Sequence, residues 1–161
     1  MSKSAKKTAA EGLDHFIPSD PAFKFRNYPF YWVARLSNRY TLEMEKQLKP
    51  FGMNISSWRI GLILREYGVI SMSEVATHAV LRLPTVNKLV YRMQEQGLVS
   101  VHRSETDARV TMVGITDQGH EVVSELIKKT SKTVERALDG LSSDEVNVLN
   151  TVLGKVFANL A

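Results

Sequence analysis

This chain of 161 residues contains no cysteine, and it also lacks the apolar segments that are typical of membrane and secreted proteins. Without cysteine the chain forms neither disulfides nor thiolate zinc sites, and thiol-based redox sensing is excluded. No apolar run approaches the ~20 residues that span a bilayer. The N-terminus lacks the apolar segment of a secretory signal. We therefore expect a cytoplasmic protein with no membrane partner.

Motifs for catalysis and metal binding are also missing from the sequence. The sequence contains no G-x-S-x-G, no phosphate-binding loop and no dinucleotide fingerprint. A small hydrolase or transferase would need a nucleophile paired with a base, and no such pair is visible. The four histidines lack ligand spacing: they are His15, His78, His102 and His120. We expect no enzymatic activity, no cofactor and no metal.

Charge is present but is not concentrated in one region. The net charge is +4 and the sequence pI is about 9.4, which permits binding to a polyanion without establishing it. Residues 71–116 are nearly balanced, with Arg82, Lys88, Arg92, Arg103 and Arg109 against Glu74, Glu95, Glu105 and Asp107. If this region binds nucleic acid, a few well-placed arginines must make the contacts.

The first half of the chain predicts a tail followed by three helices. Residues 1–22 are expected to be a flexible basic tail, because Pro18 and Pro21 prevent a continuous helix. Apolar residues at helical spacing predict helices over about 30–48 and 56–67. Ser71 and Glu74 have the spacing of a capping box, which opens a short helix that ends near residue 80.

A longer helix is predicted over Pro84–Gly97, with Gly97 as its C-cap. Its buried stripe consists of Val86, Leu89, Val90 and Met93. Residues 98–103 and 109–115 are rich in β-branched residues and predict a two-stranded hairpin. A long helix follows over 116–138. A last helix opens on a second capping box, and its coiled-coil-like seam is Val146, Leu149, Leu153, Val156 and Leu160.

The order of these elements predicts a mainly α fold with a small β-hairpin wing. This is a winged helix-turn-helix with long N- and C-terminal dimerisation helices. We expect one domain over residues 23–161. Its flanking helical parts are 23–50 and 117–161, and its DNA-binding part is 55–115.

The predicted longer helix has a polar face opposite its buried stripe. Thr85, Asn87, Lys88, Tyr91 and Arg92 lie there and include residue types that contact base edges and phosphates. The alternative is that this polar face is only solvated, which is the commonest situation for such residues on a helix. The hairpin favours DNA binding, because Arg103 and Arg109 flank a loop able to reach a minor groove, which attracts arginine.

Several stretches of the sequence resemble the MarR-type winged-helix transcriptional regulators. The most specific is Asp107-Ala108-Arg109, followed at fixed spacing by Ile115-Thr116-Asp117-Gln118-Gly119. The others are Ile55-Ser56-Ser57-Trp58-Arg59-Ile60-Gly61-Leu62, Ser73-Glu74-Val75-Ala76, Thr85-Val86-Asn87-Lys88-Leu89-Val90-Tyr91-Arg92-Met93 and Gly97-Leu98-Val99. The resemblance covers about residues 30–160.

This resemblance implies roles for particular residues. Asp107 would brace the wing by pairing with a basic residue, with Arg92 as the expected partner, and Arg109 would enter the minor groove. The family is dimeric through its long terminal helices, which makes 23–50 and 117–161 the expected dimerisation parts. A two-fold dimer implies a pseudo-palindromic DNA operator with half-sites ~34 Å apart. Two residues depart from the family pattern. Arg82 replaces a small N-capping residue, which leaves the helix less well capped or adds a phosphate contact, and Tyr91 replaces an acidic residue.

Many members of the family release DNA when a small molecule binds. Here the candidate ligand residues are Tyr28, Trp32, Arg35 and Arg39 on the first helix and its approach, with Trp58 and Arg59 on the second. Aromatic walls with guanidinium groups suit an aromatic carboxylate, because arginine binds a carboxylate bidentately. An aromatic stripe on a helix is usually part of a dimer core, and an exposed arginine is usually solvated. The resemblance extends to members that control catabolism of aromatic acids or their CoA thioesters.

Two function classes follow from the sequence. The first is a homodimeric repressor that an aromatic acid or its CoA thioester releases from its operator. The alternative is a winged-helix protein-interaction module without ligand-responsive DNA binding.

Overall fold

The structure is a computed structural model that describes residues 12–160. Of the predicted tail, residues 1–11 lie outside the described range. The following residues contain a short 3-10 helix, η1, at Asp14–Phe16, and a second one, η2, at Phe25–Asn27. The chain divides into two compact units at the boundary between Glu43 and Met44, and each unit is described by itself.

The N-terminal unit contains an aromatic segment that leads into helix α1, Pro29–Leu48. Proline begins this helix, as the sequence predicts. The indole N–H of Trp32 donates to the carbonyl of Arg26 at 2.9 Å. The Phe25 and Tyr31 rings meet edge-on, with 4.7 Å between their centroids. These contacts hold the first turns of α1 against the residues that precede them.

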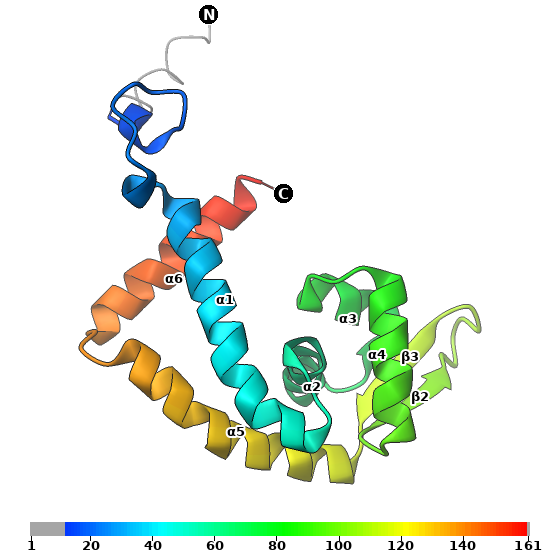
Figure 1. Cartoon of the computed structure of the whole chain (residues 1–161). Helices are drawn as coiled ribbons and strands as arrows, with labels where there is room; N and C mark the ends of the chain where they lie inside the picture. Colours follow the sequence, from blue (N-terminus) through cyan, green and yellow to red (C-terminus); the bar gives the residue numbers. More distant parts are fainter. Residues whose placement is uncertain (1–11, 161) are drawn as a thin grey trace, which may run out of the picture. The chain divides into compact units, whose positions relative to one another are not determined.

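The second unit carries the predicted order of helices and hairpin (Figure 1). The predicted helices are confirmed to within a few residues at their ends. After the end of α1, the elements in chain order are η3 Lys49–Phe51, α2 Ile55–Tyr67, β1 Ile70–Ser71, α3 Met72–Ala79, α4 Leu83–Glu95, β2 Val99–Arg103, β3 Thr111–Ile115, α5 Asp117–Leu138 and α6 Ser143–Ala158.

The sheet has three antiparallel strands in the order β1-β3-β2, so the predicted two-stranded hairpin was incomplete. The hairpin strands pair from Val99 opposite Ile115 to Arg103 opposite Thr111. The added strand, β1, pairs Ile70 with Val113 on the other side of β3. A strand of two residues is too short to show an alternating pattern in the sequence. It makes β3 the central strand and ties the wing to the start of α3.

The core of the second unit joins all of its layers except α6. Fully buried side chains come from α2, α3, α4, β3 and α5, and they are joined by two from the end of α1. The predicted stripe of α4 is confirmed at Val86, Val90 and Met93, whereas Leu89 is partly buried. Burial of this stripe leaves the opposite face of α4 to solvent.

Side-chain caps fix where the helices begin. The two predicted capping boxes, Ser71 with Glu74 and Ser142 with Glu145, are confirmed. In each box, hydrogen bonds from the serine lower the pKa of the glutamate. A third box, in which Asn54 caps α2, was not predicted. The helical pattern alone placed the start of α2 at Ser56, past this cap.

Helices α3 and α4 end in the same hydrogen-bonded motif. At the end of α3, Leu81 N–H donates to the Ala76 carbonyl, and at the end of α4, Leu98 N–H donates to the Met93 carbonyl. This motif requires a left-handed residue after the cap. In α4 that residue is Gly97, with φ of 74°, but in α3 it is the β-branched Val80, with φ of 54°. The turn of the helix-turn-helix therefore carries backbone strain.

We predict that Val80→Gly stabilises the protein. Glycine removes a left-handed penalty of about 1–2 kcal/mol and adds an entropy cost of about 0.5–1 kcal/mol. The Val80 side chain is 69% exposed, so its loss removes little burial. A net gain near 1 kcal/mol raises Tm by about 2–4 °C. Thermal unfolding at fixed protein concentration measures the change, with Gly97→Ala as the reciprocal, destabilising variant. A lower Tm for Val80→Gly would contradict the strain argument.

Candidate nucleic-acid interface

Helices α3 and α4, joined by residues 80–82, form the helix-turn-helix. Pro84 lies in the first turn of α4, where a missing N–H costs nothing. The predicted DNA-contacting residues lie on the helix face opposite the core or just before it. Arg82, Thr85, Lys88, Tyr91 and Arg92 are exposed, and Asn87 is partly buried. The face combines hydroxyl, amide, phenol and guanidinium groups, the types that contact phosphates and base edges.

The start of α4 has the weak cap that the sequence led us to expect. Arg82 occupies the N-cap position in an extended conformation, and among the described residues its side chain makes no capping hydrogen bond. The first turn contains no acidic residue. Pro84 has no N–H, and the Thr85 and Val86 N–H groups donate to the Arg82 carbonyl. What the helix start offers an anion is therefore its positive dipole, with no acidic residue to offset it.

Arginine 59 supports the end of the helix that precedes α4. The guanidinium of Arg59, on α2, donates to the carbonyl of Ala79 at 2.7 Å. Ala79 is the last residue of α3, where carbonyls lack helical partners and a cation is favourable. Sequence reasoning missed this contact, because the two residues are 20 positions apart and no local sequence motif indicates that they meet.

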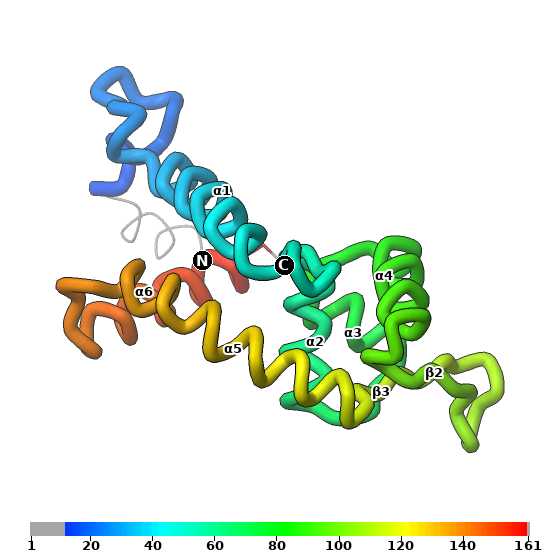
Figure 2. Tube along the Cα trace, turned by 60° about the horizontal axis from the view of Figure 1, so that its bottom comes forward, coloured from blue at the N-terminus to red at the C-terminus, as the bar shows by residue number. Residues whose placement is uncertain are grey.

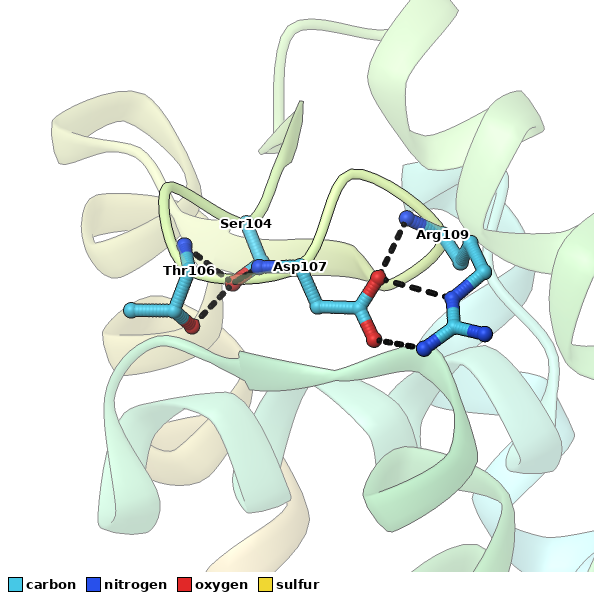
Figure 3. Close-up of polar contacts among 4 residues, drawn as sticks. All are labelled: Ser104, Thr106, Asp107 and Arg109. Carbon is cyan, nitrogen blue, oxygen red and sulfur yellow. Dashed lines mark hydrogen bonds and ion pairs between the residues drawn. The ribbon is translucent and has the colours of Figure 1, made fainter.

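The wing loop is organised around a serine and an aspartate (Figure 3). The Ser104 hydroxyl accepts hydrogen bonds from the backbone N–H groups of Thr106 and Asp107. The Asp107 carboxylate accepts from Nε of Arg109 at 3.0 Å and from Nη2 at 2.9 Å. It also accepts from the Arg109 backbone N–H at 3.0 Å. The aspartate thus fixes both the backbone and the side chain of Arg109.

The expectation that Asp107 pairs with Arg92 was wrong, because its carboxylate forms a two-point pair with Arg109 instead. A two-residue separation within one loop brings the two groups together at little entropic cost. Side-chain and backbone hydrogen bonds from Arg109 lower the pKa of Asp107, and the same pair raises the pKa of Arg109. Both groups are therefore charged at neutral pH.

Arg109 remains available to a ligand although it is paired. Its side chain is 91% exposed. The pair uses two of the five N–H donors of the guanidinium, so three are left for an acceptor outside the loop. Arg103, the other predicted wing contact, is exposed on β2 and donates to the Thr111 hydroxyl at 3.2 Å. In Figure 2 the loop that carries Arg109 is the outermost part of the hairpin.

The predicted ligand residues fall into two groups. In the N-terminal unit, the Tyr28 ring packs edge-on against Phe30, Trp32 is half exposed, Arg35 donates to the Tyr31 hydroxyl at 2.8 Å, and Arg39 pairs with Glu43 at 3.5 Å. In the second unit, Trp58 is buried in the core and Arg59 binds the Ala79 carbonyl.

Residues 12–160 contain neither a candidate metal site nor a candidate membrane-spanning helix. Within that range, no group of three or more His, Asp or Glu side chains could hold a metal ion. Over the same residues, no helix combines the length and the apolar character needed to cross a membrane.

A helix-turn-helix with an exposed polar face, followed by a hairpin that presents an arginine at its tip, defines a winged-helix DNA-binding protein. A sequence model of the MarR family matches residues 53–111. The HTH-type transcriptional repressor IacR of Pseudomonas putida is 41% identical over 157 residues, which cover 98% of this chain and 94% of the relative. The chain therefore belongs to the MarR family and is a DNA-binding transcriptional repressor.

Solved structures agree with this assignment at the level of the fold. A MarR family regulator from Silicibacter pomeroyi superposes with a TM-score of 0.80 at 20% identity, covering 89% of this chain and 99% of that one. An E. coli MarR mutant complexed with operator DNA gives 0.69 at 18% identity, covering 77% and 89%. Bordetella bronchiseptica BpsR, whose DNA binding is regulated by 6-hydroxynicotinic acid, gives 0.75 at 19% identity, covering 83% and 94%.

We predict that Arg109→Ala weakens specific DNA binding by about 1–3 kcal/mol, roughly 5- to 150-fold, because the wing loses its oriented guanidinium. Lys132→Ala on α5 is the matched control: it removes the same charge from an exposed side chain outside the wing. Fluorescence anisotropy with a labelled operator duplex measures both variants. Equal affinities for the two variants would show that the wing arginine makes no specific contact.

Proposed function

We propose that the protein acts as a homodimeric repressor that a small aromatic acid, or its CoA thioester, releases from a pseudo-palindromic operator. The observation that carries the DNA-binding part is the exposed face of α4 beside the oriented Arg109. In this proposal α4 lies in the major groove, where Thr85, Asn87, Lys88, Tyr91 and Arg92 contact bases and phosphates. Arg82 contacts phosphate at the start of the helix, and Arg103 and Arg109 reach the neighbouring minor groove.

Helix α6 supports the homodimer. Its described side chains are all exposed or only partly buried, although the helix is rich in apolar residues. Exposed large side chains include Val148, Leu149, Val152, Leu153 and Phe157, with fractions from 41% to 65%. A contiguous apolar face of this kind is typical of an interface. In the proposed homodimer, the coiled-coil-like seam of α6 packs against a second copy of the chain. The seam consists of Val146, Leu149, Leu153, Val156 and Leu160.

We predict that Leu153→Glu shifts the protein toward monomer, because it puts a charge into the centre of the seam. Asn147→Glu introduces the same charge on the opposite side of α6 and should leave the dimer intact. Sedimentation velocity over a range of concentrations measures both variants. A wild-type chain that stays monomeric at micromolar concentration would remove the homodimer from the proposal.

The aromatic residues of the N-terminal unit support the proposal that the effector is an aromatic acid. Arg35 lies over the Tyr31 ring at 5.3 Å and donates to its hydroxyl, which places a guanidinium beside an aromatic surface. Trp32 is 53% exposed, and the side chain of Arg39 is 77% exposed. An aromatic carboxylate would stack on such rings and pair with a guanidinium. Tyr28 completes this surface within the N-terminal unit.

The comparisons favour an effector of the same chemistry. BpsR responds to 6-hydroxynicotinic acid, a heteroaromatic carboxylate, on the same fold. The similar proteins reported above are transcriptional regulators, which supports a role without catalysis.

We predict that the protein shifts a duplex taken from upstream of its own gene, with a Kd of about 10⁻⁸–10⁻¹¹ M. Benzoate, phenylacetate or their CoA thioesters should reverse the shift. Trp32→Ala should preserve the shift and reduce this response, whereas Tyr67→Ala, an exposed aromatic on α2, should change neither. If the protein binds the duplex and none of these compounds reverses the binding, the proposed class of effector is wrong. Failure to bind any duplex in a salt-sensitive manner would favour the winged-helix protein-interaction module.

A further inference from the structure

The chain just beyond the recognition helix α4 is bound to the first residues of α5. Three consecutive carbonyls, those of Gln96, Gly97 and Leu98, all accept hydrogen bonds from that segment. The Thr116 hydroxyl donates to Gly97 at 2.7 Å, and the Thr116 backbone N–H donates to Leu98 at 3.1 Å. The Gln118 side chain reaches Gln96 at 3.4 Å. The last carbonyls of α4 itself are satisfied by the turn that follows it, Met93 by the Leu98 N–H and Gln94 by the Gly97 N–H, and the start of α5 holds that turn in place.

The hydroxyl of Thr116 forms hydrogen bonds both to the turn after α4 and to the first turn of α5. While it donates to Gly97, the Thr116 hydroxyl accepts the backbone N–H of Gly119 at 3.0 Å, which makes Thr116 the N-cap of α5. A threonine hydroxyl has one donor and two acceptor positions, so both bonds form together. The same atom therefore joins the turn after α4 to the start of α5.

The junction is also closely packed. A methyl group at Gly119 would overlap the Leu98 carbonyl, and one at Gly97 would lie 2.8 Å from Oε1 of Gln118. Gly97 has a positive φ as well, so glycine is required there for two reasons. Contacts this tight leave the two helices little freedom to change their mutual angle.

We propose that Thr116 is a positioning residue for DNA recognition. Because α5 has 22 residues, it is about 33 Å long, and a small rotation at its start becomes a large displacement at its far end. In the homodimer proposed above, on which this inference rests, the angle between α4 and α5 sets the distance between the two recognition helices. Thr116 then determines which spacing of half-sites the dimer accepts.

Three substitutions separate the two roles of the hydroxyl. Thr116→Ser keeps both the donor and the cap. Thr116→Val removes both. Thr116→Asp keeps an excellent N-cap for α5 but has no donor for the Gly97 carbonyl. If Thr116→Val unfolds, Thr116→Asp still tests the junction in a folded protein, and its Tm reports whether α5 is intact.

The first measurement examines the junction within one chain. The protein has no cysteine, so Gln94→Cys and Lys128→Cys, both at exposed positions on α4 and α5, accept spin labels without competing sites. Labelled protein is diluted with unlabelled protein, and pulsed electron resonance gives the distance distribution between the labels. We expect it to broaden in Thr116→Asp and Thr116→Val and to stay narrow in Thr116→Ser. An unchanged width in Thr116→Asp would overturn the positioning role.

The second measurement uses duplexes that the wild-type protein selects from a random-sequence library. Spacers between the half-sites are then lengthened or shortened by single base pairs. Loss of one hydrogen bond, about 1–1.5 kcal/mol, should lower the affinity of Thr116→Asp about tenfold at the native spacing. At altered spacings the loss should be smaller, and Thr116→Ser should match the wild type throughout.

Two other outcomes would count against the inference. An equal loss of affinity at every spacing would identify Thr116 as a stability residue only. A monomeric chain in sedimentation would overturn the homodimer and the spacing role together, whereas the intrachain distance would still report on the junction.

Discussion

Burial of one stripe of α4 decides most of what this molecule presents to DNA. Val86, Val90 and Met93 are held in a core shared with α2, α3 and the sheet, so α4 cannot rotate without exposing them. The polar face is consequently oriented by hydrophobic packing rather than by its own contacts. The helix ends are secured separately. Arg59 binds the last carbonyl of α3, and Thr116 binds the chain after α4.

Secondary structure was largely predictable from the sequence, and the reasons are local. Each capping box marks a helix start within four residues of sequence, as Ser71 with Glu74 and Ser142 with Glu145 do. The buried stripe on α4 repeats at helical spacing. The faces follow from the same periodicity, which is why the exposed face of α4 was also predictable. Strand β1 was not predictable, because a strand of two residues that pairs with a strand 43 positions away, as Ile70 does with Val113, leaves no pattern of its own in the sequence.

The contacts that position the interface were harder to predict because they depend on tertiary structure. The sequence resemblance favoured Arg92 as the partner of Asp107, and only the folded loop shows that Arg109 takes that place. The strained Val80 follows from the way α3 must turn into α4, whereas valine in isolation favours extended backbone. Sequence reasoning thus identified the residues that face outward better than those that hold them in place.

The pairing of Arg109 with Asp107 has a consequence for how the protein searches the genome. A guanidinium already matched by a carboxylate adds little to the net charge of the wing, so a binding event there displaces few counterions from DNA. Non-specific adhesion depends on that displacement, so the wing adds little to it. Less of the protein is then retained on unrelated sequence by the wing, and more of it is free to occupy the operator.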